Sequence, residues 1–329
     1  MIKRGFFLGL ISTLVISPGL SPASASDLAP SVAILDTSVD SKIIEVKQNL
    51  LHEVCILEWS VCPNGKDFLE GPNSSYLPVK YGLSSSFDHG TQMASVAIST
   101  NPSLPIVFMR IIGAAESGAR LRTTEQTIYQ ALEWVLNNRL RFNIQAVALA
   151  QSSHNLLSYK DYCPKSARSA SAITNLFNAD IPVFVASGND GDKSRVSWPG
   201  CLPLAIPIGA VTNGQISSYS NVDPNLSIFF AAGEAKARSS LQLQVNASGT
   251  SVSTQVFAAM WIYLRTQLPD LSLVESISFM KSAARQVKYQ EKIGYWIDKD
   301  DLIQAVEKRK YGVTLSSKTY IVRKTRMLI

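Results

Sequence analysis

Three side chains that lie far apart in the chain have the types needed for nucleophilic chemistry: Asp36, His89 and Ser251. A serine hydroxyl is a weak nucleophile unless a neighbouring base takes its proton, and a neutral imidazole suits that task near physiological pH. A carboxylate beside the imidazole fixes its tautomer and stabilises the imidazolium that forms. We therefore predict a serine nucleophile, a histidine base and an aspartate that orients the base.

Ser251 precedes a run that is apolar nearly all round, from Val252 to Leu268. Such a run predicts a buried central helix with Ser251 in its first turn. The free backbone N–H groups and the dipole at that turn favour a developing negative charge on the serine or on an oxyanion beside it. On this stretch alone, a simpler interpretation stays open, in which Ser251 is only the N-cap of the helix.

The other candidates also have simpler interpretations. The chain has three histidines, and His89 is the one that Gly-Thr follows. Asp40 and Asp88 are nearby alternatives to Asp36, but only Asp36 ends a run typical of a buried strand. Asn189 lies in Gly-Asn-Asp-Gly, which is either a simple turn or the position of an amide donor.

Short apolar runs bounded by glycine or proline alternate with helical patterns along the chain. We expect strands at residues 31–35, 106–109, 146–150, 181–186 and 204–210, and helices at residues 90–98, 124–138, 166–179, 252–268 and 272–287. This alternation predicts an α/β fold of three layers, α/β/α, with a central, mostly parallel sheet. In such sheets, sites form at the carboxyl ends of strands, where Asp36 and Asn189 are expected.

Four segments resemble the sequence patterns of the subtilisin-like serine peptidases, the subtilase family. They are Asp36-Thr37-Ser38, His89-Gly90-Thr91, Ala186-Ser187-Gly188-Asn189 and Gly249-Thr250-Ser251, and they occur in the family's order. The resemblance extends between these motifs over residues 31–306. It implies a subtilisin-like fold and a serine endopeptidase that hydrolyses peptide bonds through an acyl-enzyme intermediate.

The resemblance also implies a role for each site residue. Asp36, His89 and Ser251 form the catalytic triad, and the side-chain amide of Asn189 donates to the oxyanion together with the backbone N–H of Ser251. The implied substrate-binding residues are Ser117 and Gly118 on one wall of the cleft, Ala150, Gln151 and Ser152 on the opposite strand, and Gly188. The implied partner is a peptide or protein substrate.

The chain departs from the family's patterns at five positions. Ser253 and Gln255 replace a small apolar residue and a proline after the nucleophile, Ser38 and Ser95 replace glycines, and Ala150 replaces a serine. None of these changes removes a catalytic group, but they alter the packing and the shape of the cleft. Two alternatives therefore stay open: a catalytically weak or inactive subtilase-fold protein that binds peptide segments without cutting them, and a serine esterase that uses the same groups.

The N-terminus has the pattern of a secretory signal peptide. Two basic residues precede an apolar run, and a small-residue cleavage site of the A-x-A kind ends at Ala25. We expect a signal peptide at residues 1–25, one subtilisin-like peptidase domain at residues 26–306, and a basic tail at residues 307–329 whose alternation is consistent with a β-hairpin. The protein is then secreted, and no later run is long enough to form a stable membrane anchor.

Four cysteines in an exported chain predict two disulfides. Three pairings exist. Closeness in sequence favours Cys55 with Cys62, and the fold implied by the resemblance favours Cys163 with Cys201. A zinc site is the weaker alternative, because no pair has C-x-x-C spacing. No cofactor is expected; calcium is frequent in the family, but no loop clusters enough carboxylates to name its ligands.

The formal net charge of +6 includes the basic residues of the signal peptide and of the tail, so the body of the protein is close to balanced. A nucleic-acid-binding protein needs a basic stripe interleaved with aromatic residues, and no nucleic-acid partner is expected. A dinucleotide-binding fold is excluded, because residues 36–39 replace the glycine-rich turn that would follow the first strand.

Overall fold

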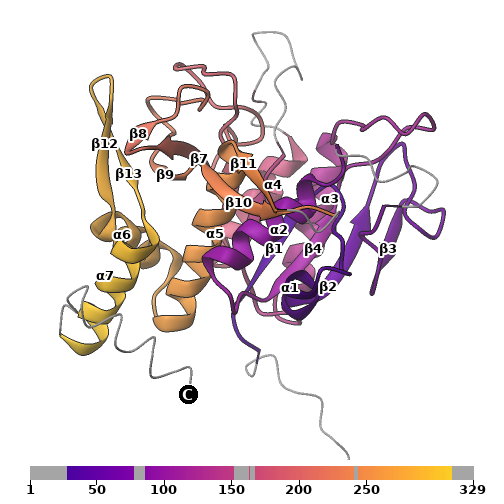
Figure 1. Ribbon diagram of the computed structural model, residues 1–329, viewed down its shortest axis with the longest axis horizontal. Coiled ribbons are helices and arrows are strands. Elements are labelled where there is room, and N and C mark those ends of the chain that lie inside the picture. Colours follow the sequence, from indigo (N-terminus) through magenta and orange to yellow (C-terminus); the bar gives the residue numbers. More distant parts are fainter. Residues whose placement is uncertain (1–27, 78–85, 152–162, 164–166, 241–243, 313–329) are drawn as a thin grey trace, which may run out of the picture.

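This computed structural model of the protein describes residues 28–77, 86–151, 163, 167–240 and 244–312. The expected signal peptide, most of the expected tail with its β-hairpin, and Ser152 lie outside these residues. Within them, an eleven-stranded sheet forms the middle layer of the molecule (Figure 1). Its strands are β1 (Ser31–Asp36), β2 (Leu50–Ile56), β3 (Phe68–Glu70), β4 (Ile106–Arg110), β5 (Ile144–Leu149), β6 (Val183–Ala186), β7 (Ala205–Thr212), β8 (Gln215–Ile216), β9 (Phe229–Ala232), β12 (Arg285–Tyr289) and β13 (Lys292–Trp296).

The sheet is parallel except at three strands. Its order is β12-β13-β9-β7-β6-β5-β1-β4-β2-β3, with β8 paired to β7. β3, β8 and β12 each run antiparallel to one neighbour. β1 pairs in parallel with both β4 and β5, so that Val32 lies opposite Ile106 on one side and Ala146 on the other. Asp36, the last residue of β1, therefore lies near the middle of the edge at which the parallel strands end.

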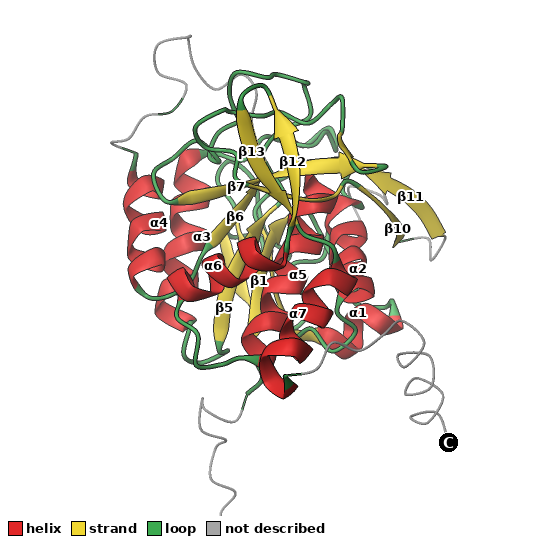
Figure 2. Cartoon of the chain, turned by 90° about the vertical axis from the view of Figure 1, so that its left-hand side faces the viewer, coloured by secondary structure: helices red, strands yellow, loops and turns green. Residues whose placement is uncertain are grey.

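Successive side chains of β1 point into two separate cores. Val32 and Ile34 belong to the core beneath α5, whereas Ala33 and Leu35 belong to the core beneath α3 and α4; all four are fully buried. Figure 2 shows helices on both faces of the sheet. The helices are α1 (Ile44–Asn49), α2 (His89–Thr100), α3 (Glu125–Asn138), α4 (Arg168–Asn178), α5 (Thr250–Gln267), α6 (Leu273–Ala283) and α7 (Lys299–Tyr311). The prediction of a three-layer α/β/α fold with a mostly parallel sheet is confirmed.

The central helix α5 is buried along most of its length, as its apolar run predicts. The ring of Phe184 in β6 meets the rings of Phe257 and Trp261 at centroid distances of 4.9 and 5.4 Å. The indole N–H of Trp261 donates to the backbone oxygen of Gln145 at 3.1 Å. Because burying one large apolar side chain contributes about 1.5–3 kcal/mol, these contacts hold the helix, and the serine in its first turn, firmly against the sheet.

The helix expected at residues 272–287 is shorter than the sequence predicts. Its capping box is present, since Ser272 and Glu275 each cap the other's backbone. However, the helix ends at Ala283, and the prediction of helix beyond it is wrong, because residues 285–289 form β12 and pair with β13. The strand is favoured there because Val287 is buried against Phe230 while the residues on either side of it stay exposed.

A small second sheet and the C-terminal helix complete the described part of the fold. β10 (Glu234–Arg238) and β11 (Gln244–Ser248) form an antiparallel pair that leads into α5. The first residues of the expected tail, 307–311, belong to α7. The last turn of α7 carries three basic residues, and positive charges stabilise the C-terminal end of a helix. In the part of the chain that the structure describes, no helix combines the length and apolar character needed to cross a membrane.

Candidate active site

A buried carboxylate and an imidazole form the centre of the site. Asp36 ends β1 and is fully buried, and His89 is the first residue of α2. The Nδ1 atom of His89 lies 2.8 and 2.9 Å from the two carboxylate oxygens of Asp36. Burial raises the pKa of Asp36, but the charge and hydrogen bond of His89 and the backbone N–H of Thr37 outweigh it and hold this pKa below its usual value. Since an ionised carboxylate only accepts hydrogen bonds, Nδ1 carries the proton and Nε2 is free to act as a base.

The residues next to Asp36 and His89 lock their two segments together. The hydroxyl of Thr37 donates to the backbone oxygen of Phe87 at 2.8 Å and accepts from the N–H of Gly90 at 2.8 Å. The hydroxyl of Ser38 donates to the same oxygen of Phe87 at 2.9 Å. A Cβ atom on Gly90 would lie 2.4 Å from the backbone oxygen of Ser38. Glycine is therefore required for the helix that carries His89 to approach the end of β1.

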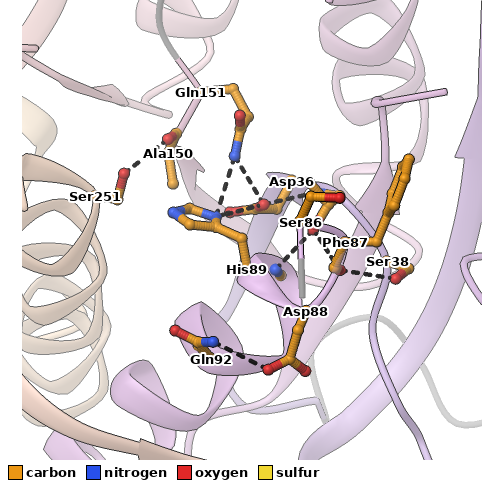
Figure 3. A network of polar contacts seen from close by, with 12 residues as sticks. Asp36, Ser38, Ser86, Phe87, Asp88, His89, Gln92, Ala150, Gln151 and Ser251 are labelled. Carbon is orange, nitrogen blue, oxygen red and sulfur yellow. Dashed lines mark hydrogen bonds and ion pairs between the residues drawn. The ribbon is translucent and has the colours of Figure 1, made fainter. Parts of the chain in front are cut away.

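Ser251 lies in the first turn of α5, after Gly249, whose φ of +135° suits glycine. The hydroxyl of Ser251 donates to the backbone oxygen of Ala150 at 3.0 Å. Figure 3 shows the second ring nitrogen of His89 on the side that faces Ser251. The structure thus brings Asp36, His89 and Ser251 into one site, with the serine hydroxyl directed to Ala150. The hydrogen bond between a serine nucleophile and its histidine base is often long or poorly aligned before a substrate binds.

Thr250 holds the side chain of Asn189 beside the serine. The Oδ1 atom of Asn189 accepts from the backbone N–H of Thr250 at 2.8 Å and from its hydroxyl at 2.9 Å. The same hydroxyl accepts from the N–H of Gly188 at 3.1 Å. Because Oδ1 is engaged twice, the Nδ2 group is the free end of this exposed amide, and it faces Gly249, 3.2 Å from the position of a Cβ atom there. An amide fixed in this way can donate to a negative charge next to Ser251.

The loop that carries Asn189 is supported from below by Asn221. The side-chain Oδ1 atom of Asn221 accepts from the backbone N–H groups of Asp190 and Asp192 at 2.9 and 3.0 Å. The backbone N–H of Asn221 donates to the backbone oxygen of Gly188 at 2.9 Å. Gly188 has a φ of +111°, and a Cβ atom on it would lie 2.2 Å from the hydroxyl of Ser197. Gly188 therefore shapes this loop through its backbone.

The predicted substrate-binding residues Ser117 and Gly118 lie at the tip of a tight turn. The backbone N–H of Ala115 donates to the oxygen of Ala119 at 2.8 Å, and that of Gly118 donates to the oxygen of Ala115 at 2.9 Å. Ser117 is exposed. The base of the turn is held by Ser60, whose hydroxyl donates to the oxygen of Ala114 at 2.9 Å and accepts from its N–H at 3.1 Å.

Both disulfides have the pairings that the sequence favours. Cys55 is bonded to Cys62, which closes the loop that carries Ser60. Cys163 is bonded to Cys201. All four cysteines are therefore in disulfides and are not zinc ligands. Among the residues described, no group of three or more histidine, cysteine or carboxylate side chains is arranged to hold a metal ion.

The opposite strand supplies contacts that the sequence did not reveal. Ala150 and Gln151 follow β5 and are both buried. The side-chain Nε2 of Gln151 lies 2.8 Å from Oδ1 of Asp36 and 3.1 Å from Nδ1 of His89, and its oxygen accepts a hydrogen bond from Arg120. The sequence assigned Gln151 only to substrate binding, and it gave Arg120 no role of its own beyond ending the segment that resembles one wall of the cleft. No motif in the sequence marks either contact.

Ser95 in α2 and Asp88, the residue just before α2, tie the site to β10 and to the residues that follow it. Ser95, which replaces a glycine in the family's pattern, accepts from the backbone N–H of Arg238 at 2.8 Å and donates to the backbone oxygen of Gln92 at 2.7 Å. Asp88 accepts from the backbone N–H of Ser240 at 2.5 Å and from its hydroxyl. These contacts fasten the helix of His89 to the hairpin that leads to Ser251.

Two other departures have no such compensation. Ser253 and Gln255 in α5 are fully buried. The hydroxyl of Ser253 and both polar atoms of the Gln255 amide have no hydrogen-bond partner among the residues described. A buried polar group without a partner costs about 1–3 kcal/mol, so these two positions lower the stability of the helix that carries the serine.

Known proteins are similar to this chain in both sequence and fold. The subtilase family profile matches residues 28–313. The chain is 23% identical over 241 residues to alkaline elastase YaB of Bacillus sp. (strain YaB). The aligned region covers 70% of this chain and 58% of that protein. It is 25% identical over 147 residues to a cuticle-degrading serine protease of Arthrobotrys oligospora, which covers 43% of this chain and 32% of that protein. The chain thus spans less than two thirds of the length of these curated relatives.

Solved structures agree with this result at the level of the fold. A protease from Pseudoalteromonas arctica superposes with a TM-score of 0.65 at 19% identity, covering 86% of this chain and 92% of that chain. At this identity the likeness concerns the fold alone. Because the family profile spans nearly all of the described residues, the chain belongs to the subtilase family of serine peptidases.

Proposed function

We propose that the protein is a secreted serine endopeptidase whose nucleophile is Ser251. The observation that carries this proposal is the 2.8 Å hydrogen bond between Nδ1 of His89 and the buried carboxylate of Asp36; the other ring nitrogen of His89 faces the serine (Figure 3). A hydroxyl, a base and an orienting carboxylate in this relation are the groups that acyl transfer from a peptide requires. Membership of the subtilase family supports the same class of reaction.

In the proposed reaction, the Oγ atom of Ser251 attacks the carbonyl carbon of the scissile bond while its proton passes to Nε2 of His89. Asp36 accepts from the Nδ1–H group throughout and stabilises the imidazolium. The oxyanion that forms accepts hydrogen bonds from Nδ2 of Asn189 and from the backbone N–H of Ser251. His89 then gives its proton to the departing amine as the C–N bond breaks. Water hydrolyses the resulting ester by the same steps.

The proposed substrate is an extended peptide that lies between the turn of Ser117 and Gly118 and the segment of Ala150 and Gln151. Support comes from the backbone oxygen of Ala150, which already accepts a hydrogen bond from Ser251 and can equally accept an N–H group of a peptide. We also propose export, with cleavage after Ala25. The two disulfides support this location, because such bonds persist in oxidising compartments.

The test is labelling of the purified protein by a serine-directed fluorophosphonate, together with cleavage of an unstructured protein substrate. We expect the wild type to be labelled and to cleave, and Ser251→Ala to do neither. Ser253→Ala is the matched control, because it removes a buried hydroxyl from the same helix turn and should leave labelling intact. If the wild type is not labelled, or if Ser251→Ala is labelled equally, the proposal is wrong.

One observation favours the second candidate, a protein that binds peptides without cutting them. The hydroxyl of Ser251 donates to Ala150 rather than to His89. This candidate predicts that intact peptides are recovered from the purified protein by mass spectrometry while labelling and cleavage are absent. Labelling of Ser251 would exclude it.

A further inference from the structure

The side-chain amide of Gln151 contacts both members of the Asp36–His89 pair. Its Nε2 atom lies 2.8 Å from Oδ1 of Asp36 and 3.1 Å from Nδ1 of His89, as Figure 3 shows. Its other end contacts the guanidinium of Arg120. A guanidinium has only donors, so the atom that faces it must be the amide oxygen, and the atom that faces Asp36 must be the NH2 group. The orientation of this amide therefore follows from its chemistry.

Only one of the two atoms near the amide nitrogen can accept its hydrogen bond. The carboxylate of Asp36 is charged and closer, whereas Nδ1 of His89 is neutral, farther away and already carries a proton. Hydrogen bonds to charged groups are about twice as strong as those between neutral groups. Gln151 therefore donates to Asp36 and reinforces the tautomer in which Nε2 of His89 can accept the proton of the serine.

The fully buried carboxylate depends on such donors. Oδ1 of Asp36 accepts from the backbone N–H of Thr37 at 2.6 Å as well as from Gln151 and His89. A buried carboxylate without hydrogen bonds tends to take up a proton. The positive charge of Arg120 also lowers the pKa of Asp36, after the larger effects of burial, of His89 and of Thr37.

We propose that Gln151 is a positioning residue that holds Asp36, and through it His89, and that Arg120 in turn holds Gln151. This inference rests on the proposed function of the site. Arg120 follows the turn of Ser117 and Gly118, so the row of contacts connects one wall of the cleft with the catalytic pair. A peptide that displaces this wall changes how firmly the carboxylate is held.

The first variant is Gln151→Met, which keeps the length of the side chain and removes its donor and acceptor. We expect kcat to fall about tenfold with KM changed less than about twofold, since one charge-assisted hydrogen bond is lost. The acid limb of kcat/KM should move to higher pH, because the pair binds its proton more tightly once a donor is removed. A purely structural role would lower stability without moving this limb.

Arg120→Met tests the outer contact at an exposed position, and Arg122→Met, two residues further on and also exposed, is its matched control. We expect Arg120→Met to lower kcat about threefold in the wild type and to have a much smaller effect in Gln151→Met, because most of its effect on kcat passes through the amide of Gln151. The control should leave kcat and the pH profile unchanged. Equal effects of Arg120→Met with and without Gln151 would overturn the proposal.

A spectroscopic measurement decides the matter without any activity. The Nδ1–H proton of His89, which donates to a buried carboxylate, is expected to give a low-field NMR signal. Its chemical shift should differ between the wild type and Gln151→Met, and between Ser251→Ala and the variant that combines Ser251→Ala with Gln151→Met. An unchanged signal would overturn the positioning role, even in a protein that the phosphonate does not label. Failure of labelling in the wild type would instead count against the proposed function.

Discussion

The hydroxyl of Thr250 is expected to act on catalysis by holding the loop of Asn189, because it donates to Oδ1 of Asn189 and accepts from the backbone N–H of Gly188. It supplies one of the two hydrogen bonds that fix Oδ1 of Asn189, at 2.9 Å, and the backbone N–H of the same residue supplies the other, at 2.8 Å. Thr250→Val keeps the shape and the backbone bond but removes the hydroxyl. A neutral hydrogen bond contributes about 0.5–1.5 kcal/mol, which corresponds to a fall in kcat of about 2- to 12-fold. By contrast, removing the donor itself in Asn189→Ala should lower kcat about 10²- to 10³-fold.

The decisive assay is a double-mutant cycle on kcat with a chromogenic peptide amide. If Thr250 acts only by orienting the amide, Thr250→Val should change kcat less than about twofold in the Asn189→Ala background. Thr254→Val is the control, because it removes a buried hydroxyl one turn further along α5, where it donates only to the backbone oxygen of Thr250 at 2.8 Å. Two fully additive effects on kcat would refute this reasoning.

Three further outcomes follow from the structure. Gly90→Ala should lower the rate of phosphonate labelling about 10²-fold, because its Cβ atom would lie 2.4 Å from the oxygen of Ser38 and displace the histidine. Gln255→Met should raise the free energy of unfolding by about 1 kcal/mol in a urea titration and preserve activity, because it removes a buried amide without partners. Although burial raises the pKa of Asp36 and of Asp192, hydrogen bonds and neighbouring charges lower both, the second to about 2. The stability that these two ionised carboxylates provide is therefore complete above their usual pKa of 3.8 and is lost as pH falls below it. Urea midpoints measured from pH 5 to pH 2 should fall accordingly. The fall should be smaller in Asp36→Asn, which lacks one of the two carboxylates.

Many buried elements were predictable because burial leaves a pattern, although the strands β2 and β9, which are also buried over much of their length, were not predicted. β1 and α5 are apolar on every side that meets a core, and both were found from hydropathy alone. β10 and β12 were missed because each is short and largely exposed, and each has a single buried residue, Ala237 in β10 and Val287 in β12. In such strands the backbone pairing determines the structure, and hydropathy carries little information about it.

The site likewise contains residues that the sequence identified and a contact that it did not. Asp36, His89, Asn189 and Ser251 lie in short motifs whose spacing points to chemistry, and the structure brings these segments together. The contact of Gln151 with Arg120 joins residues 31 positions apart, with α3 and β5 between them, and it depends on the exact reach of two flexible side chains. Local sequence does not determine that reach.

The position of β1 at the centre of the sheet has a consequence for how the protein matures. The first strand cannot complete its pairing until β4 and β5 have been synthesised, and the helix that bears the nucleophile lies against strands that end as late as residue 232. Assembly from such distant partners is slow compared with local folding. A nascent or truncated polypeptide that stops before the final quarter of the chain therefore holds Asp36 and His89 without the hydroxyl of Ser251, so the proposed catalytic centre cannot form before the scaffold around it has been synthesised.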